Sequence, residues 1–302
     1  MSEDNTSNIS VCAACGIAEV DEVKMKECAD CDLVRYCSDE CQKNHATLHK
    51  EACKKRAAEL RDELLFKQPD GTHRGDCPIC MIPLPLKKSI IMSCCSKLIC
   101  RGCHYANQKR EYEGRIEHSC LFCRKPTVAT DEECDKQRMK RIEANDPAAM
   151  RQEGKELCKK GEYGSAFEYF TRAAGLGDVG AQFQLADLYR NGLGVEKDRG
   201  REIHHLEEAA IGGHPYARYN LGCHEWHNDN KERAVKHWII SANLGDDASI
   251  KALMNEFRSG IVSKDDLAAA LRAHQVAVDA TKSPQREAAD EYYRELDSMH
   301  SC

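Results

Sequence analysis

The cysteines are the residues of this sequence whose type and spacing are best suited to chemistry. The chain has 19 cysteines in 302 residues, and fifteen of them lie between Cys12 and Cys123. Most stand in pairs separated by two residues, a spacing that lets two sulfurs bind one metal ion. An odd number of cysteines in such pairs does not favour a disulfide framework. In a protein that is not secreted, paired cysteines more often bind metal, so the pattern predicts zinc sites.

The first group of candidate ligands contains seven cysteines and one histidine. It comprises Cys12, Cys15, Cys28, Cys31, Cys37, Cys41, His49 and Cys53. Eight ligands suffice for two tetrahedral zinc ions, because a structural zinc site holds four protein ligands and accepts both thiolate and imidazole. The spacings from Cys37 to Cys53 suit a helix that projects each pair of ligands from one face. His45 is an alternative to His49.

The second group of candidate ligands is made of cysteines alone. It comprises Cys77, Cys80, Cys94, Cys95, Cys100, Cys103, Cys120 and Cys123. Adjacent ligands on one metal strain the backbone, so His104 or His118 could replace one member of the Cys94–Cys95 pair. A zinc ion with four protein ligands has no position left for water, and any activity must therefore come from the surface of the module.

The elements around these cysteines fall into two parts. Up to Cys123 there are few continuous apolar runs, and domains this small rarely fold on hydrophobic burial alone, so metal is the expected staple. We expect a helix over 54–66, ended by turn chemistry at Gln68–Gly71. A charged helical stretch over 131–144 leads into the second part.

The second part has an internal period. The segment Ala173–Asp178 recurs as Ala209–His214 and again as Ser241–Asp246, in steps of about 36 and 32 residues. Between these segments, a helix with small and aromatic residues is followed by a turn and a second amphipathic helix. Helix pairs of this kind stack into a curved solenoid whose concave face binds peptides or folded partners.

Composition excludes several classes of function. The net charge is −6 with acidic and basic residues intermixed, which argues against nucleic-acid binding, since that needs clustered Lys and Arg. The polar N-terminus and the lack of long apolar runs predict no signal peptide and no membrane span, hence the cytosol or the nucleus. The sequence has no phosphate-binding glycine loop and no serine-centred nucleophile elbow.

The first cysteine group resembles a MYND-type zinc finger, a likeness that extends to Arg35–Ser38, Cys41–Gln42 and His49–Lys50. The resemblance implies an interleaved arrangement of the ligands. One zinc ion would be held by Cys12, Cys15, Cys37 and Cys41, and the other by Cys28, Cys31, His49 and Cys53. Ala46 stands where the family often has a tryptophan that grips proline-containing peptides, which puts peptide binding by this finger in doubt.

The second group resembles a RING finger of the all-cysteine kind. The resemblance implies one zinc ion on Cys77, Cys80, Cys100 and Cys103 and another on Cys94, Cys95, Cys120 and Cys123. RING ubiquitin ligases present an apolar patch to a ubiquitin-conjugating enzyme, and a cationic side chain then orders the ubiquitin thioester. Ile79 and Arg124 match these two positions, whereas Leu121 replaces a proline that is common in the family.

The periodic half resembles Sel-one-like repeats of the tetratricopeptide class. The expected fold is two small cross-braced zinc-binding modules with little regular structure, followed by an all-α tetratricopeptide-like solenoid. We predict a MYND-type finger at 8–55, a helical linker at 56–72, a RING-type finger at 73–127, a second helical linker at 128–145, four repeats with a degenerate last unit at 146–282, and a C-terminal capping helix and tail at 283–302.

These resemblances lead to one main function and one alternative. The main hypothesis is a RING-type ubiquitin-protein ligase that carries four zinc ions, binds a ubiquitin-conjugating enzyme and recruits protein substrates or peptides through its helical repeats. The alternative is a non-enzymatic adaptor whose zinc fingers and repeats assemble protein complexes.

Overall fold

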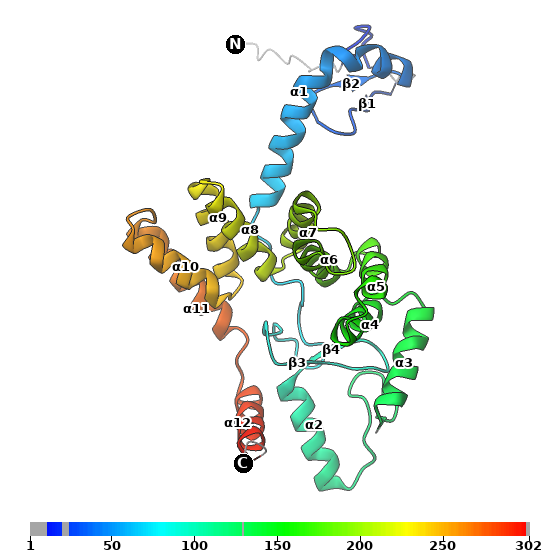
Figure 1. Cartoon of the computed structure of the whole chain (residues 1–302), viewed down its shortest axis with the longest axis vertical. Coiled ribbons are helices and arrows are strands. Elements are labelled where there is room, and N and C mark those ends of the chain that lie inside the picture. Colours follow the sequence, from blue (N-terminus) through cyan, green and yellow to red (C-terminus); the bar gives the residue numbers. More distant parts are fainter. Residues whose placement is uncertain (1–10, 20–23, 129, 300–302) are drawn as a thin grey trace, which may run out of the picture. The chain divides into compact units, whose positions relative to one another are not determined.

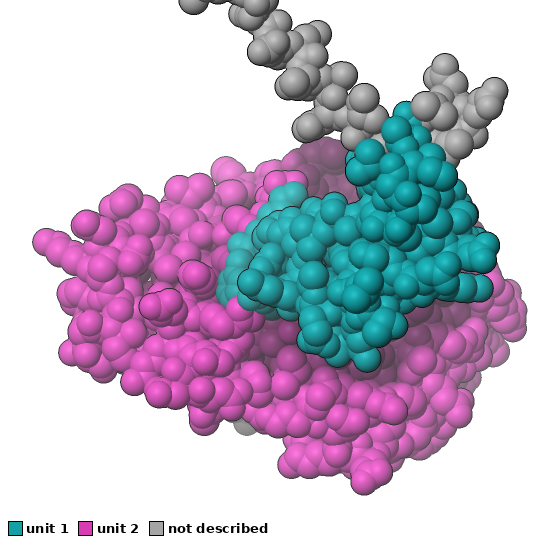
Figure 2. Space-filling model, turned by 90° about the horizontal axis from the view of Figure 1, so that it is seen from above, with its two compact units in different colours: residues 1–67 teal, residues 68–302 magenta. Residues whose placement is uncertain are grey.

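The computed structural model describes residues 11–19, 24–128 and 130–299. The chain divides into two compact units, residues 1–67 and 68–302, which Figure 2 colours separately. The ends of the predicted domains at residues 8 and 302 lie outside the described residues. No helix in the described ranges is long and apolar enough to cross a membrane.

The first unit has little regular structure apart from one long helix. Strands β1 (Lys26–Glu27) and β2 (Arg35–Tyr36) pair antiparallel, and α1 (Asp39–Phe66) follows. The Ser38 side chain accepts a hydrogen bond from the amide of Cys41 and so caps α1. We expected a helix over 54–66 and helical spacing of the ligands from Cys37 to Cys53. One helix, α1, contains both the predicted helix and the ligands Cys41, His49 and Cys53, since no proline or glycine interrupts this segment.

The second unit begins with the second cysteine group. Strands β3 (Ser89–Ile91) and β4 (Leu98–Cys100) form an antiparallel hairpin, and α2 (Arg101–Gly114) continues directly from β4. The small core of this region contains Leu84, Met92 and Ile99 together with buried cysteine side chains. Helix α3 (Asp131–Glu143) then leads to the repeats. Because the core is so small, cysteine side chains make up much of the buried interior of this module.

The repeats form four helix pairs. They are α4 (Pro147–Lys160) with α5 (Tyr163–Gly175), α6 (Val179–Asn191) with α7 (Arg199–Ile211), α8 (Pro215–His227) with α9 (Lys231–Asn243), and α10 (Asp247–Arg258) with α11 (Lys264–Asp279). Each helix packs against the next one along the chain, and the pairs follow one another in an arc (Figure 1). The first helix of every pair is capped by the side chain of the residue before it, namely Asp146, Asp178, His214 and Asp246.

Small residues allow the helices of each pair to approach closely. Ala166, Ala173 and Ala181 are fully buried, as are the corresponding alanines of the later repeats. In α4, a Cβ added to Gly154 would stand 2.6 Å from the Phe170 ring of α5. The first repeat therefore has no room for a side chain at this position.

The last helix, α12 (Pro284–Met299), lies along α2 of the second cysteine module (Figure 1). We expected it to cap the end of the repeat array. The difference has a physical reason: Tyr292 of this helix packs against Tyr105 of α2, and Asp290 forms an ion pair with Lys88, directly before β3. The polar side chains of α12 suggested a solvent-facing cap, but some of them contact the second cysteine module.

The segment before the second module is held on the second repeat. The amide of His73 donates to the carbonyl of Gly213 in the turn between α7 and α8 (3.0 Å). The imidazole of His214 is stacked between the rings of His73 and Phe183, with 4.3 Å between centroids on each side. Burial, and next the charge of Arg74, lowers the pKa of His73 from 6.5 to about 4. This stack therefore requires neutral imidazoles.

We predict that Gly154→Ala lowers the free energy of unfolding by about 1–3 kcal/mol, as expected for overpacking in a filled core. Gly164→Ala in α5 of the same repeat is the matched control, because a Cβ there meets no atom within 4 Å. Urea unfolding followed by circular dichroism measures both. Equal effects of the two substitutions would contradict the close approach of α4 and α5.

We also predict that acid weakens the His73 stack. The unfolded chain takes up a proton near pH 6.5 and the folded chain only near pH 4, so stability is present above pH 6.5, falls through this interval and then levels off. The loss is at most about 3 kcal/mol, from about 1.4 kcal/mol per pKa unit. Urea unfolding at pH 7 and pH 5 should show a weaker pH dependence for His73→Gln than for the wild type, and identical dependences would refute the prediction.

Candidate metal centres

The structure brings the sixteen predicted ligands together in four groups of four. The groups are Cys12, Cys15, Cys37 and Cys41; Cys28, Cys31, His49 and Cys53; Cys77, Cys80, Cys100 and Cys103; and Cys94, Cys95, Cys120 and Cys123. Within each group, all ligand atoms lie within 4.8 Å of one another. In both modules the groups interleave along the sequence, so each module is a cross-brace of two sites.

The spacing of the sulfurs matches a tetrahedral metal site. Described sulfur pairs are 3.6 Å apart for Cys15 and Cys37, 3.8 Å for Cys80 and Cys100, and 3.8 Å for Cys95 and Cys120. Zinc bound at about 2.3 Å by each thiolate gives sulfur–sulfur edges of about 3.8 Å. The same distances are far from the roughly 2 Å of a disulfide bond. The geometry and the donor set of the four clusters therefore suit zinc, with four sites in total.

The structure separates the histidine ligand from the alternatives. His49 is buried, and its Nε2 lies 3.2 Å from the sulfur of Cys31. His45 instead pairs its Nδ1 with the hydroxyl of Tyr36, at 3.1 Å. His118 pairs with Glu111, and His104 with Tyr293. None of these three alternatives lies within a described four-ligand cluster.

A repeated backbone turn presents the sulfurs of the second module. In Cys77–Met81 and Cys120–Arg124, the amide of the last residue donates to the carbonyl of the first at 2.9 Å, and the last residue has a left-handed φ of 56° or 61°. Met92–Ser96 forms the same turn, with 2.7 Å between the Ser96 amide and the Met92 carbonyl and a φ of 55° at Ser96. Met92 thus takes the place of a first cysteine, and Cys94 stands inside the turn. The left-handed backbone at Ser96 also occurs at Met81 and Arg124, in turns without adjacent ligands, so it belongs to the turn and not to the adjacency of Cys94 and Cys95.

Electrostatics of the clusters favour a divalent cation. The neighbouring thiol of Cys15 raises the pKa of Cys37 to about 12, and burial raises the pKa of Cys95 to about 11. In contrast, hydrogen bonds from backbone amides, that of Cys37 first, lower the pKa of Cys12 to about 6. The pKa shifts therefore favour the thiolate form of some ligands and oppose the simultaneous deprotonation of all the ligands in a cluster. A bound cation of charge two removes that resistance.

The surface residues singled out from the sequence lie outside the clusters. Ile79 is 38% exposed, and Arg124 is exposed directly after Cys123. Ala46 lies on an exposed turn of α1. Sequence analysis missed Phe122, which is 45% exposed next to the last ligand, although its position between Cys120 and Cys123 could have identified it. It also missed Arg286, which donates a hydrogen bond to the sulfur of Cys80 from 206 residues away, and no local pattern signals that contact.

Comparison with protein families finds two kinds of module. A MYND finger matches residues 12–53, and Sel1 repeats match residues 148–178, 179–214 and 215–246. The three matched repeats coincide with α4–α9, and the pair α10–α11, our predicted fourth unit, lies beyond them. A search of curated proteins finds no match.

Two solved structures are similar to this chain. A Sel1 repeat protein from Oxalobacter formigenes is 18% identical with a TM-score of 0.44, over 64% of this chain and 86% of its own. The protective antigen c5321 of uropathogenic Escherichia coli strains, which displays an SLR fold, is 20% identical with a TM-score of 0.39, over 55% of this chain and 37% of its own. With the geometry above, the family matches identify a zinc-binding repeat protein that contains a MYND finger and three Sel1 repeats.

Proposed function

We propose that each of the four clusters holds one zinc ion through the four residues named for it above. The supporting observation is the spacing of the sulfurs, which fits a tetrahedral ion and no disulfide. The ions act as structural staples, because four protein ligands leave no position for water or substrate. The zinc ions thus fix the shape of two small modules, and the function resides in the surfaces of those modules and not at the metal.

The second module is, in this proposal, the RING-type finger of a ubiquitin-protein ligase, over residues 73–127. The single observation that carries it is the pair of interleaved sites around a short hairpin and α2, with Ile79 exposed in the loop between two ligands of the first site. Phe122 supplies a second exposed apolar side chain, between two ligands of the other site. Such side chains on a rigid loop suit a conjugating enzyme, since buried apolar anchors carry much of the energy of an interface.

The proposed reaction needs no covalent step on this chain. The module would bind the conjugating enzyme, and Arg124 would orient the thioester-linked ubiquitin. The substrate lysine would attack the thioester carbonyl, so that an isopeptide bond forms, the carbon–sulfur bond breaks and the cysteine thiolate of the conjugating enzyme leaves. Its contribution is proximity and orientation, which can account for several kcal/mol of a reaction barrier. Sel1 repeats generally mediate protein–protein interaction, and in this proposal they recruit the substrate.

The second candidate function is that of an adaptor without ligase activity. It is favoured by two departures from the family patterns, Ala46 in the first finger and Leu121 in the second. In that case both fingers and the repeats bind proteins and bring them together. The zinc content is the same for the two candidates, and only the activity separates them.

We predict four zinc ions per chain in reduced, full-length protein, measured by elemental analysis. Cys123→Ala should lose one zinc ion, because three ligands hold a structural site much more weakly than four. Cys158→Ala is the matched control, since this half-buried thiol lies in α4, outside the four clusters. A wild-type content of two ions would contradict the proposal for two of the four clusters.

We predict ubiquitin chain formation when the protein is mixed with activating enzyme, ubiquitin and a panel of conjugating enzymes. Ile79→Ala should lower the rate about tenfold or more with the active conjugating enzyme, the effect of losing about 1.4 kcal/mol from an interface anchor. Leu176→Ala is the control, because Leu176 is a similarly apolar side chain, 51% exposed, in the first repeat.

The adaptor is distinguished by the opposite result. Protein that retains four zinc ions but makes no ubiquitin chains with any conjugating enzyme would exclude the ligase and leave the adaptor. If chains form equally well with Ile79→Ala, the proposed contact surface is wrong.

A further inference from the structure

The guanidinium of Arg286 lies against one of the four clusters. Arg286 is only 8% exposed, in the first turn of α12. Its Nη2 donates to the sulfur of Cys80 at 3.4 Å and to the carbonyl of Ile82 at 3.0 Å. Its Nη1 donates to the carbonyl of Pro83 at 2.7 Å and to that of Thr281 at 2.6 Å. One side chain therefore holds a ligand sulfur and the loop that follows that ligand.

The backbone of α12 also fits closely against this cluster. Gly102 stands between the ligands Cys100 and Cys103, and a Cβ added to it would be 2.9 Å from both the Cα and the amide nitrogen of Arg286. Any larger residue at this position would push α12 away. The absence of a side chain at position 102 is thus what lets Arg286 reach the cluster.

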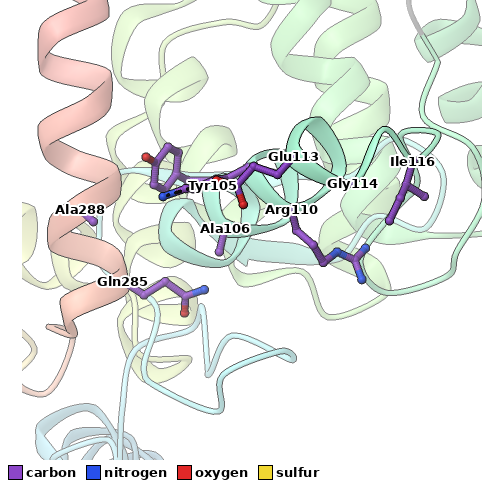
Figure 3. A pocket seen from close by; sticks show the side chains of 9 residues that line it. Tyr105, Ala106, Arg110, Glu113, Gly114, Ile116, Gln285 and Ala288 are labelled. Carbon is purple, nitrogen blue, oxygen red and sulfur yellow. Dashed lines mark ion pairs between the residues drawn. The ribbon is translucent and has the colours of Figure 1, made fainter.

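The rest of the seam between α12 and α2 is held by a few polar and aromatic contacts. Arg101 lies 4.7 Å from the centroid of the Tyr293 ring, and Tyr105 and Tyr292 have ring centroids 4.8 Å apart. Figure 3 shows Gln285 and Ala288 across from α2, around a cavity of about 540 Å³. Arg286 lies outside the lining of this cavity, and its contacts join α12 to the cluster directly.

The contact between Arg286 and the cluster matters because the two carry opposite charges. A zinc ion with four thiolate ligands has a formal charge of about −2, and burying that charge is costly without a cation or hydrogen-bond donors nearby. Outer partners of this kind tune the affinity and reactivity of a metal site. The all-cysteine cluster of Cys94, Cys95, Cys120 and Cys123 provides an internal comparison, because the side-chain hydrogen bonds described for its sulfurs join one thiol to another.

We infer that Arg286 is an outer partner of the zinc site formed by Cys77, Cys80, Cys100 and Cys103, and that α12 thereby controls how firmly this one site retains its ion. Arg286 does not bind the metal. It is a positioning residue that offsets the negative charge of the thiolates and fixes the loop after Cys80. The inference rests on the proposed zinc assignment and goes beyond it.

The test measures zinc release from full-length protein loaded with four zinc ions, using a chromogenic chelator. Arg286→Met should release one of the four ions at least tenfold faster than the wild type and leave the other three unchanged. Arg286→Lys, which keeps the charge but loses the forked hydrogen bonds, should be intermediate. Gly102→Ala should also accelerate one ion, because it displaces α12 without altering the arginine. Arg294→Gln, an exposed position on the same helix, is the control.

A spectroscopic reading separates an electrostatic role from a merely structural one. In protein loaded with cobalt, loss of a hydrogen bond to a thiolate should shift part of the sulfur-to-metal charge-transfer absorption to lower energy in Arg286→Met. Four bound zinc ions with equal release rates in the wild type and Arg286→Met, and no such shift, would overturn this inference alone. A wild-type chain without zinc at this cluster would overturn the zinc assignment as well.

Discussion

Mutual repulsion among closely spaced sulfur atoms is the constraint on which both cysteine modules depend. Ligand sulfurs that lie 3.4–3.9 Å apart cannot all be thiolates unless a cation stands between them. The modules have too little apolar interior to hold this arrangement by burial, as the few core residues around Ile99 illustrate. We therefore expect metal binding and folding to be coupled in each module.

The parts of the molecule that follow a local rule could be predicted from the sequence. Ligand pairs two residues apart identify both modules, and the spacing of Ala173, Ala209 and Ser241 identifies the helix pairs, because each pattern repeats the geometry of its structure. The place of Cys94 was harder to assign, since the turn that it occupies has Met92 where the other turns have cysteine. Hydrogen bonds of the backbone, not residue types, make those turns alike.

Long-range packing was beyond the reach of the sequence. The polarity of α12 is compatible with a cap on the repeats and with a partner for α2, and only the contacts of Arg286, Tyr292 and Tyr293 decide between them. The sequence shows α1 in two parts, as helically spaced ligands up to Cys53 and as an apolar face over 54–66, and the structure joins them in one helix. His73 carries no local signal either, since its stacking partner His214 lies 141 residues further along the chain.

The position of α12 has a consequence for how the protein is made. A ribosome completes the second cysteine module about 160 residues before it reaches Arg286, so the module emerges and can meet zinc while its C-terminal partner does not yet exist. Chains that stop early lack this partner permanently, although every ligand is present. Full-length translation, and not merely the supply of metal, is thus needed to finish a module near the beginning of the chain.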